Sequence, residues 1–121
     1  SMRIASLKVA DKNGSKLDIS VTTFPGDVGG LLANVNRWLG QIELSPVDQS
    51  SLEKYCSPFT IAGNPGHFIE AYGEKDALLA GALFLGKESW FFKLLGNRTL
   101  AEKEKGKFIE FLHSITPKPK Q

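Results

Sequence analysis

The sequence is poor in the residues that most often perform chemistry. Among 121 residues there is one cysteine, Cys56, and there are two histidines, His67 and His113. A single thiol excludes an internal disulfide and also a zinc site built from several cysteines. No spacing of His, Asp or Glu suggests a metal site. We therefore expect neither a metal nor another cofactor.

A catalytic group is equally hard to assemble from this sequence. Cys56 and His67 could be drawn as a nucleophile and its base, but neither an orienting motif nor a nucleophile elbow accompanies them. His113 falls near the end of a charged segment, where contact with solvent or with helical carbonyl groups is expected. We expect a protein that is not an enzyme and in which Cys56 is dispensable.

Long hydrophobic runs are also missing. No apolar stretch approaches the length of a membrane span. The N-terminal "SMRIASLKVA" alternates like a strand and lacks the continuous apolar region of a signal peptide. We interpret Ser1 and Met2 as an expression scar, so an export signal or a lipid anchor would lie outside this sequence.

Charge of either sign is modest, with a net charge of +2 and 23% charged residues. Residues 87–121 hold eight Lys and Arg against four Glu, an excess that we assign to a solvated helix face and not to nucleic-acid binding. The length suits one hydrophobic core. We predict a single α/β domain over residues 3–116, followed by a disordered basic tail over 117–121.

What the sequence does contain is a regular succession of strand and turn patterns. Asn13-Gly14, inside "DKNGS", is a strong hairpin signal between two alternating segments. Residues 77–85 are apolar on both faces, which predicts a central strand covered on both sides. The turn "GNPG" is expected to join two further strands. The predicted strands span residues 4–9, 17–23, 58–62, 67–72, 77–85 and 90–95.

Two helices and one short helical turn complete the expected elements. Asp27 is predicted to N-cap a helix that runs to about Ile42, and a helical turn is expected at 52–55. Thr99 and Glu102 fit the capping box of a closing helix. One face of that helix is predicted to carry Leu100, Phe108, Phe111, Leu112 and Ile115. The predicted fold class is α+β, an antiparallel sheet of about six strands flanked by helices.

The first helix carries an unusual set of polar residues. On a helical wheel, Trp38 lies at the edge of the apolar arc, and Asn34, Gln41 and Arg37 follow on the same flank. Asn36 lies on the opposite flank. The apolar arc consists of Leu31, Leu32, Val35, Leu39 and Ile42.

Two interpretations of this flank stay open. Its side chains either satisfy loop carbonyl and amide groups, which cost about 1–3 kcal/mol each when buried unpaired, or form a recognition patch around Trp38. We expect Asn34 to be structural. We expect Arg37 to be more exposed, with its stem along the Trp38 ring. Part of that ring is expected to be buried and part to border the flank of Asn34, Arg37 and Gln41.

Gly29 and Gly30 stand at the start of the same helix. Free amides there could bind an anion, although Asp27 would repel one. We expect the two glycines to permit close packing of the backbone on a strand. A small-ligand or anion-binding protein that uses this helix start is the alternative function.

The stretch "PGDVGGLLANVNRWLGQ" and the later "SWFFKLLG", followed by an amphipathic helix, resemble a family of small bacterial domains. These domains are often exported proteins or lipoproteins, and they are similar to the PsbP and Ran-binding Mog fold group. The likeness covers residues 3–116. Family members often have Arg where this chain has Leu39.

The resemblance implies a PsbP/Mog-like α/β/α sandwich around an antiparallel sheet. Relatives in that fold group act as binding or assembly factors. We therefore expect a non-enzymatic binding or assembly module of bacterial origin with a protein partner. The expected location is the periplasm, either free or as a membrane-anchored lipoprotein, and the cytoplasm is the alternative.

Overall fold

The computed structural model describes residues 2–116, so the interpretation of Ser1 and of the tail at 117–121 lies outside the described residues. Every predicted strand is present. The elements in chain order are β1 (Met2–Ala10), β2 (Lys16–Pro25), α1 (Gly30–Gln41), the short 3-10 helix η1 (Gln49–Lys54), β3 (Cys56–Ile61), β4 (Asn64–Tyr72), β5 (Asp76–Phe84), β6 (Glu88–Asn97) and α2 (Arg98–Ser114).

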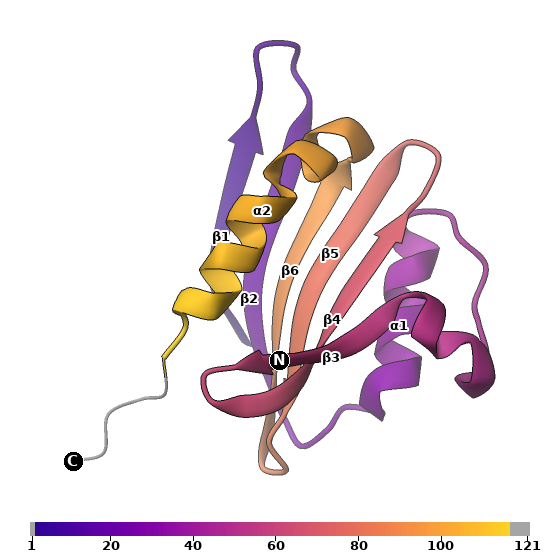
Figure 1. Cartoon of the computed structure of the whole chain (residues 1–121), viewed down its shortest axis with the longest axis vertical. Helices are drawn as coiled ribbons and strands as arrows, with labels where there is room; N and C mark the ends of the chain where they lie inside the picture. The colour runs from indigo at the N-terminus through magenta and orange to yellow at the C-terminus, as the bar shows by residue number, and fades with distance from the viewer. Residues whose placement is uncertain (1, 117–121) are drawn as a thin grey trace.

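The six strands form one antiparallel sheet in the order β1-β2-β6-β5-β4-β3. The helices α1 and α2 lie on opposite faces of this sheet (Figure 1). The predicted α+β architecture is therefore confirmed. The apolar strand β5 lies near the centre, between β4 and β6, and is buried from Ala77 to Leu83, as the sequence predicts.

Each helix builds its own hydrophobic core on the face that it covers. Along β6, alternate side chains enter different cores, because successive residues of a strand point to opposite faces. Phe92 and Leu94 pack with Phe108 and Leu112 of α2. Phe91 packs on the other face with residues of α1. The buried residues of that second core are Val35, Trp38, Leu39, Ile42, Leu52, Ile69, Ala71, Leu78, Ala80, Ala82 and Phe91.

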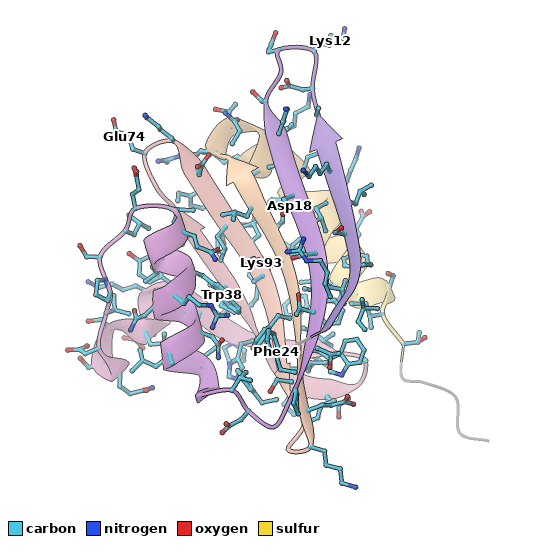
Figure 2. The ribbon with its side chains drawn as sticks, turned by 180° about the vertical axis from the view of Figure 1, so that it is seen from behind. Lys12, Asp18, Phe24, Trp38, Glu74 and Lys93 are labelled. Carbon is cyan, nitrogen blue, oxygen red and sulfur yellow. The ribbon has the colours of Figure 1, made fainter. Side chains whose placement is uncertain are left out.

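The position of α1 leaves part of its face of the sheet uncovered. Its core takes buried residues from β4, β5 and β6 but none from β1 or β2. The α1 face of β1 and β2 therefore lies beside the helix and not under it, as Figure 2 shows. This offset creates the site described below. Within residues 2–116, no helix is long and apolar enough to cross a membrane.

The start of α1 differs from the prediction. The N-cap is Gly29 and not Asp27, and it makes no side-chain cap. Gly29 and Gly30 have φ values of 90° and 81°, a left-handed conformation that is costly for residues with a Cβ atom. A Cβ atom on Gly30 would meet nothing within 4 Å. A Cβ atom on Gly29 would meet only Ala33, at 3.4 Å. The expected close packing of these glycines on a strand is therefore wrong, and their left-handed backbone conformation explains them.

Two other local predictions, the N-cap of α2 and the turn between β3 and β4, are also wrong. The N-cap of α2 is Asn97, whose side chain accepts from the Leu100 amide at 2.9 Å, while Glu102 pairs with Arg98 at 3.0 Å and not with a cap. The turn between β3 and β4 consists of Ala62 and Gly63, both with positive φ. The "NPG" that follows therefore belongs to β4.

Candidate functional site

Asn34 is buried and holds the first turn of α1 in place. It is 0% exposed, and its Nδ2 donates to the carbonyl oxygens of Gly30 at 2.6 Å and Val28 at 3.2 Å. These two carbonyl groups belong to the irregular backbone before and at the helix start. The expectation that Asn34 is structural agrees with this geometry.

A second contact with a loop comes from the opposite flank of α1. Asn36 donates from Nδ2 to the carbonyl oxygen of Val47 at 2.9 Å, and its Oδ1 accepts from the Val47 amide at 2.8 Å. This paired contact fastens the segment that follows α1 back onto the helix. Sequence reasoning placed Asn36 on the correct side of the helix but gave it no role.

Trp38 is 1% exposed, so its ring is buried almost completely. Its ring packs edge-to-face on Phe91, with 5.1 Å between the ring centroids. The Arg37 guanidinium carbon and the Lys93 Nζ lie 5.8 Å and 5.9 Å from the Trp38 ring centroid. Arg37 itself is exposed, as expected. Trp38 is therefore a buried platform below two cations.

These cations belong to a small hollow between α1 and the uncovered part of the sheet, which we call the cationic cleft. Its volume is about 240 Å³. The strand register places Ser20 opposite Lys93 and Thr22 opposite both Arg3 and Phe91, so these side chains share one face. Figure 2 shows Lys93 on this face, between β2 and Trp38. The cleft is lined by Arg3, Ser20, Thr22, Phe24, Arg37, Trp38, Phe91 and Lys93.

The cationic cleft holds three positive side chains and no carboxylate. Burial lowers the pKa of Lys93, and repulsion from Arg37 and Arg3 lowers it further, while Asp18 partly offsets these effects. The Lys93 Nζ donates to Oε1 of Gln41 at 3.0 Å, and this acceptor is neutral. The ion pairs among the described residues all lie elsewhere. An anion in the cleft would offset this repulsion.

Two members of the predicted flank, Arg37 and Trp38, line the cleft directly. Gln41 contacts it by accepting the hydrogen bond from Lys93. Sequence reasoning proposed Arg37 and Trp38 but missed the side chains that come from β1, β2 and β6. A signal for Lys93 does exist in the sequence. It is the single charge within the otherwise uncharged "SWFFKLLG".

The glycines proposed as an anion site lie outside the cationic cleft. The Gly30 amide donates to the carbonyl oxygen of Asp27 at 2.9 Å, and the Gly29 amide donates to the Asp27 carboxylate at 3.3 Å. Both amides are therefore engaged within the chain.

A second hollow, beside Cys56, has polar groups that already satisfy one another. Glu70 accepts hydrogen bonds from Tyr72 and from Lys105, the latter at 2.6 Å. Burial alone would raise the pKa of Glu70, but these two bonds lower it. Burial raises the pKa of Cys56 to about 11, which keeps the thiol protonated and weakly nucleophilic near neutral pH. No group of three metal-ligating side chains occurs within residues 2–116.

No family model, curated protein or solved structure matches this chain. The resemblance to PsbP/Mog-like domains therefore stays a prediction. What is established is an antiparallel six-stranded sheet with a helix on each face and a cationic cleft beside α1.

Proposed function

We propose that the protein is a non-enzymatic binding module that recognises an anionic group of its partner in the cationic cleft. The observation that carries this proposal is the convergence of Arg3, Arg37 and Lys93 on one hollow that no carboxylate lines. Bringing like charges together is unfavourable, and an anion at the centre would offset that cost. The two arginines and the lysine would each supply charge-assisted hydrogen bonds.

The size of the cleft favours one anionic group over a whole ligand. Pockets for small molecules usually measure about 300–1,000 Å³, whereas this cleft measures about 240 Å³. A carboxylate or phosphate group carried by a larger partner suits that volume. The hydroxyl groups of Ser20 and Thr22 line the same hollow and are further donors for such a group.

The alternative function, a protein that binds a small anion at Gly29 and Gly30, has less support. Asp27 already accepts from both of these amides and places a carboxylate beside them. A free anion would have to displace that carboxylate.

Inorganic phosphate, titrated at constant ionic strength and followed by two-dimensional NMR, tests the proposal. Saturable shifts are expected for the amides of Ser20, Thr22 and Lys93. Lys93→Met is expected to weaken phosphate binding about tenfold or more, because it removes the central charge. The matched control is Lys87→Met, which removes an exposed lysine from the turn between β5 and β6.

Two results would count against the cationic cleft. If Lys93→Met and Lys87→Met bind phosphate as the wild type does, the cleft is not the site. If the Gly29 and Gly30 amides shift while those of Ser20 and Lys93 stay unchanged, the alternative function gains the support.

A further inference from the structure

The strand β1 forms one edge of the sheet, and the described residues leave its outer side unpaired. The opposite edge, β3, is six residues long and contains Pro58, which lacks an amide donor. By contrast, β1 is nine residues long and has no proline. A bulge between Arg3 and Ala5 leaves regular pairing from Ala5 to Ala10. The edge formed by β1 is therefore the more open to another strand.

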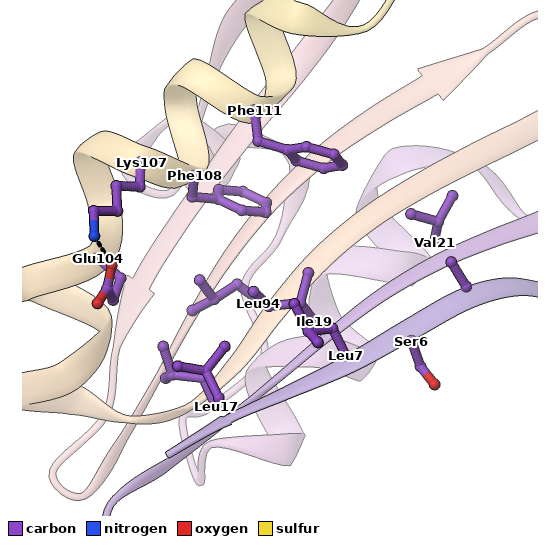
Figure 3. Close-up of a pocket in the computed structure, with 12 residues that line it drawn as sticks. Ser6, Leu7, Leu17, Ile19, Val21, Leu94, Glu104, Lys107, Phe108 and Phe111 are labelled. Carbon is purple, nitrogen blue, oxygen red and sulfur yellow. Dashed lines mark ion pairs between the residues drawn. The ribbon is translucent and has the colours of Figure 1, made fainter. Parts of the chain in front are cut away.

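On the α2 face, β1 borders an apolar groove of about 520 Å³, drawn in Figure 3. Leu7 is 60% exposed, and Phe111, which lies on the apolar face of α2 beside Phe108, is 40% exposed at the groove. The groove lies between α2 and the hairpin formed by β1 and β2, and Leu7 stays largely exposed on its β1 side. Its lining consists of Ala5, Ser6, Leu7, Val9, Leu17, Ile19, Val21, Leu94, Glu104, Lys107, Phe108 and Phe111.

On the other face, β1 carries charge of one sign. Arg3 pairs with Thr22, Ser6 with Ser20 and Lys8 with Asp18, so these side chains share the face of the cationic cleft. Arg3 lines the cleft directly, and both Arg3 and Lys8 are exposed. The strand is thus apolar toward α2 and basic toward α1.

We propose that β1 accepts an extended segment of a partner protein as a further strand of the sheet. The segment alternates apolar residues, which cover Leu7 and the groove, with acidic residues, which face Lys8 and Arg3. Backbone hydrogen bonds along the edge supply affinity, and the alternating side chains supply specificity. The inference rests on the proposed function, because the acidic side chain beside Arg3 is the anionic group that enters the cationic cleft.

A second copy of this chain fits the edge less well. Pairing β1 with another β1 would continue the same face across both sheets, so the basic residues of one copy would lie beside those of the other. Like charges in neighbouring strands are destabilising. An acidic segment turns the same positions into favourable pairs.

The test uses the full chain and an acetylated nine-residue peptide in which glutamate alternates with valine, matched to the length of β1. Calorimetry is expected to show saturable binding, and amide hydrogen exchange is expected to slow along Ala5–Ala10. The same peptide with lysine in place of glutamate should bind about tenfold more weakly or worse. Lys8→Glu should weaken binding of the glutamate peptide by a similar factor. The exposed turn variant Lys12→Glu is the control, with less than about a twofold change.

Each contrary result has a distinct meaning. If phosphate occupies the cleft while the glutamate peptide leaves β1 exchange unchanged, this inference is overturned and the proposed function stands. If neither probe binds, both are overturned. Equal affinity for the two peptides contradicts the acidic specificity. Protection of β1 that appears with increasing protein concentration alone identifies a second copy as the occupant and overturns the inference.

Discussion

At the scale of single residues, polar side chains on α1 separate into buried and exposed roles that the helical wheel could not distinguish. Asn34 and Arg37 lie on one flank in the sequence pattern, yet Asn34 is buried and bonded to two carbonyl groups while Arg37 is exposed over the Trp38 ring. The difference arises from the irregular backbone at Gly29 and Gly30. That backbone places the carbonyl groups of Val28 and Gly30 beside the Asn34 side chain.

Replacing Asn34 therefore tests the structural role directly. Asn34→Ala leaves the carbonyl groups of Val28 and Gly30 without this donor, and we expect a loss of about 1–3 kcal/mol of unfolding free energy. Gln41→Ala, at an exposed position on the same flank, should change it by less than about 0.5 kcal/mol. Denaturant unfolding measures both. Equal effects of the two substitutions would contradict the assignment.

The positive charge of Lys93 destabilises the folded protein, and the size of this effect depends on pH. Because burial and then Arg37 and Arg3 lower its folded pKa below the ordinary value of 10.5, the unfolded chain holds more protons at this site between those two pKa values. Stability of the wild type should therefore rise with pH in that window, as Lys93 loses its proton. Below the window the cost is fully present.

The variant Lys93→Met removes this cost, so it should unfold at higher denaturant than the wild type near neutral pH. Its advantage should shrink as the pH approaches 10.5, because the wild type then becomes neutral at Lys93. Urea unfolding at several pH values gives the comparison, with Lys87→Met as the control. A lower stability of Lys93→Met at neutral pH would show that the lysine has favourable partners in the free protein.

At the scale of elements, alternation was enough to predict the strands, while the ends of the elements needed three-dimensional information. The prediction for β5 was confirmed because its apolar residues demand cover on both faces. The start of α2 was misassigned because Asn97 competes with Thr99 as a cap, and the observed bond joins Asn97 to the Leu100 amide. Both residues are favourable N-caps by the local rules. Asn97 takes this role because β6 ends at Asn97 and α2 begins at the next residue.

The glycines of α1 provide a test of the element's start. Gly30 has a φ of 81°, so Gly30→Ala should cost about 1–2 kcal/mol through backbone strain. Gly40 lies within the same helix with open space around it and without a positive φ, so Gly40→Ala should stabilise by about 0.5–1 kcal/mol. Thermal unfolding of the two variants should therefore move in opposite directions. A neutral Gly30→Ala would mean that the helix starts differently in solution.

At the scale of the whole molecule, both candidate surfaces arise from one feature, the incomplete cover of the hairpin formed by β1 and β2. The offset of α1 opens the cationic cleft on one face, and the apolar groove lies between the hairpin and α2 on the other. The cleft could not be predicted from the sequence, because Arg3, Ser20, Arg37 and Lys93 meet only through the strand order that places β6 beside β2.

Lys93 lies in the cationic cleft, which we propose binds an anion. The most direct test is the pKa of its amino group, measured by NMR with isotope-labelled lysine in the absence and presence of phosphate. We expect a pKa below 10.5 for the free protein, because of burial and the nearby Arg37 and Arg3, and a rise when phosphate binds. A pKa at its ordinary value that phosphate leaves unchanged would show that Lys93 is neither buried among cations nor a ligand of the anion.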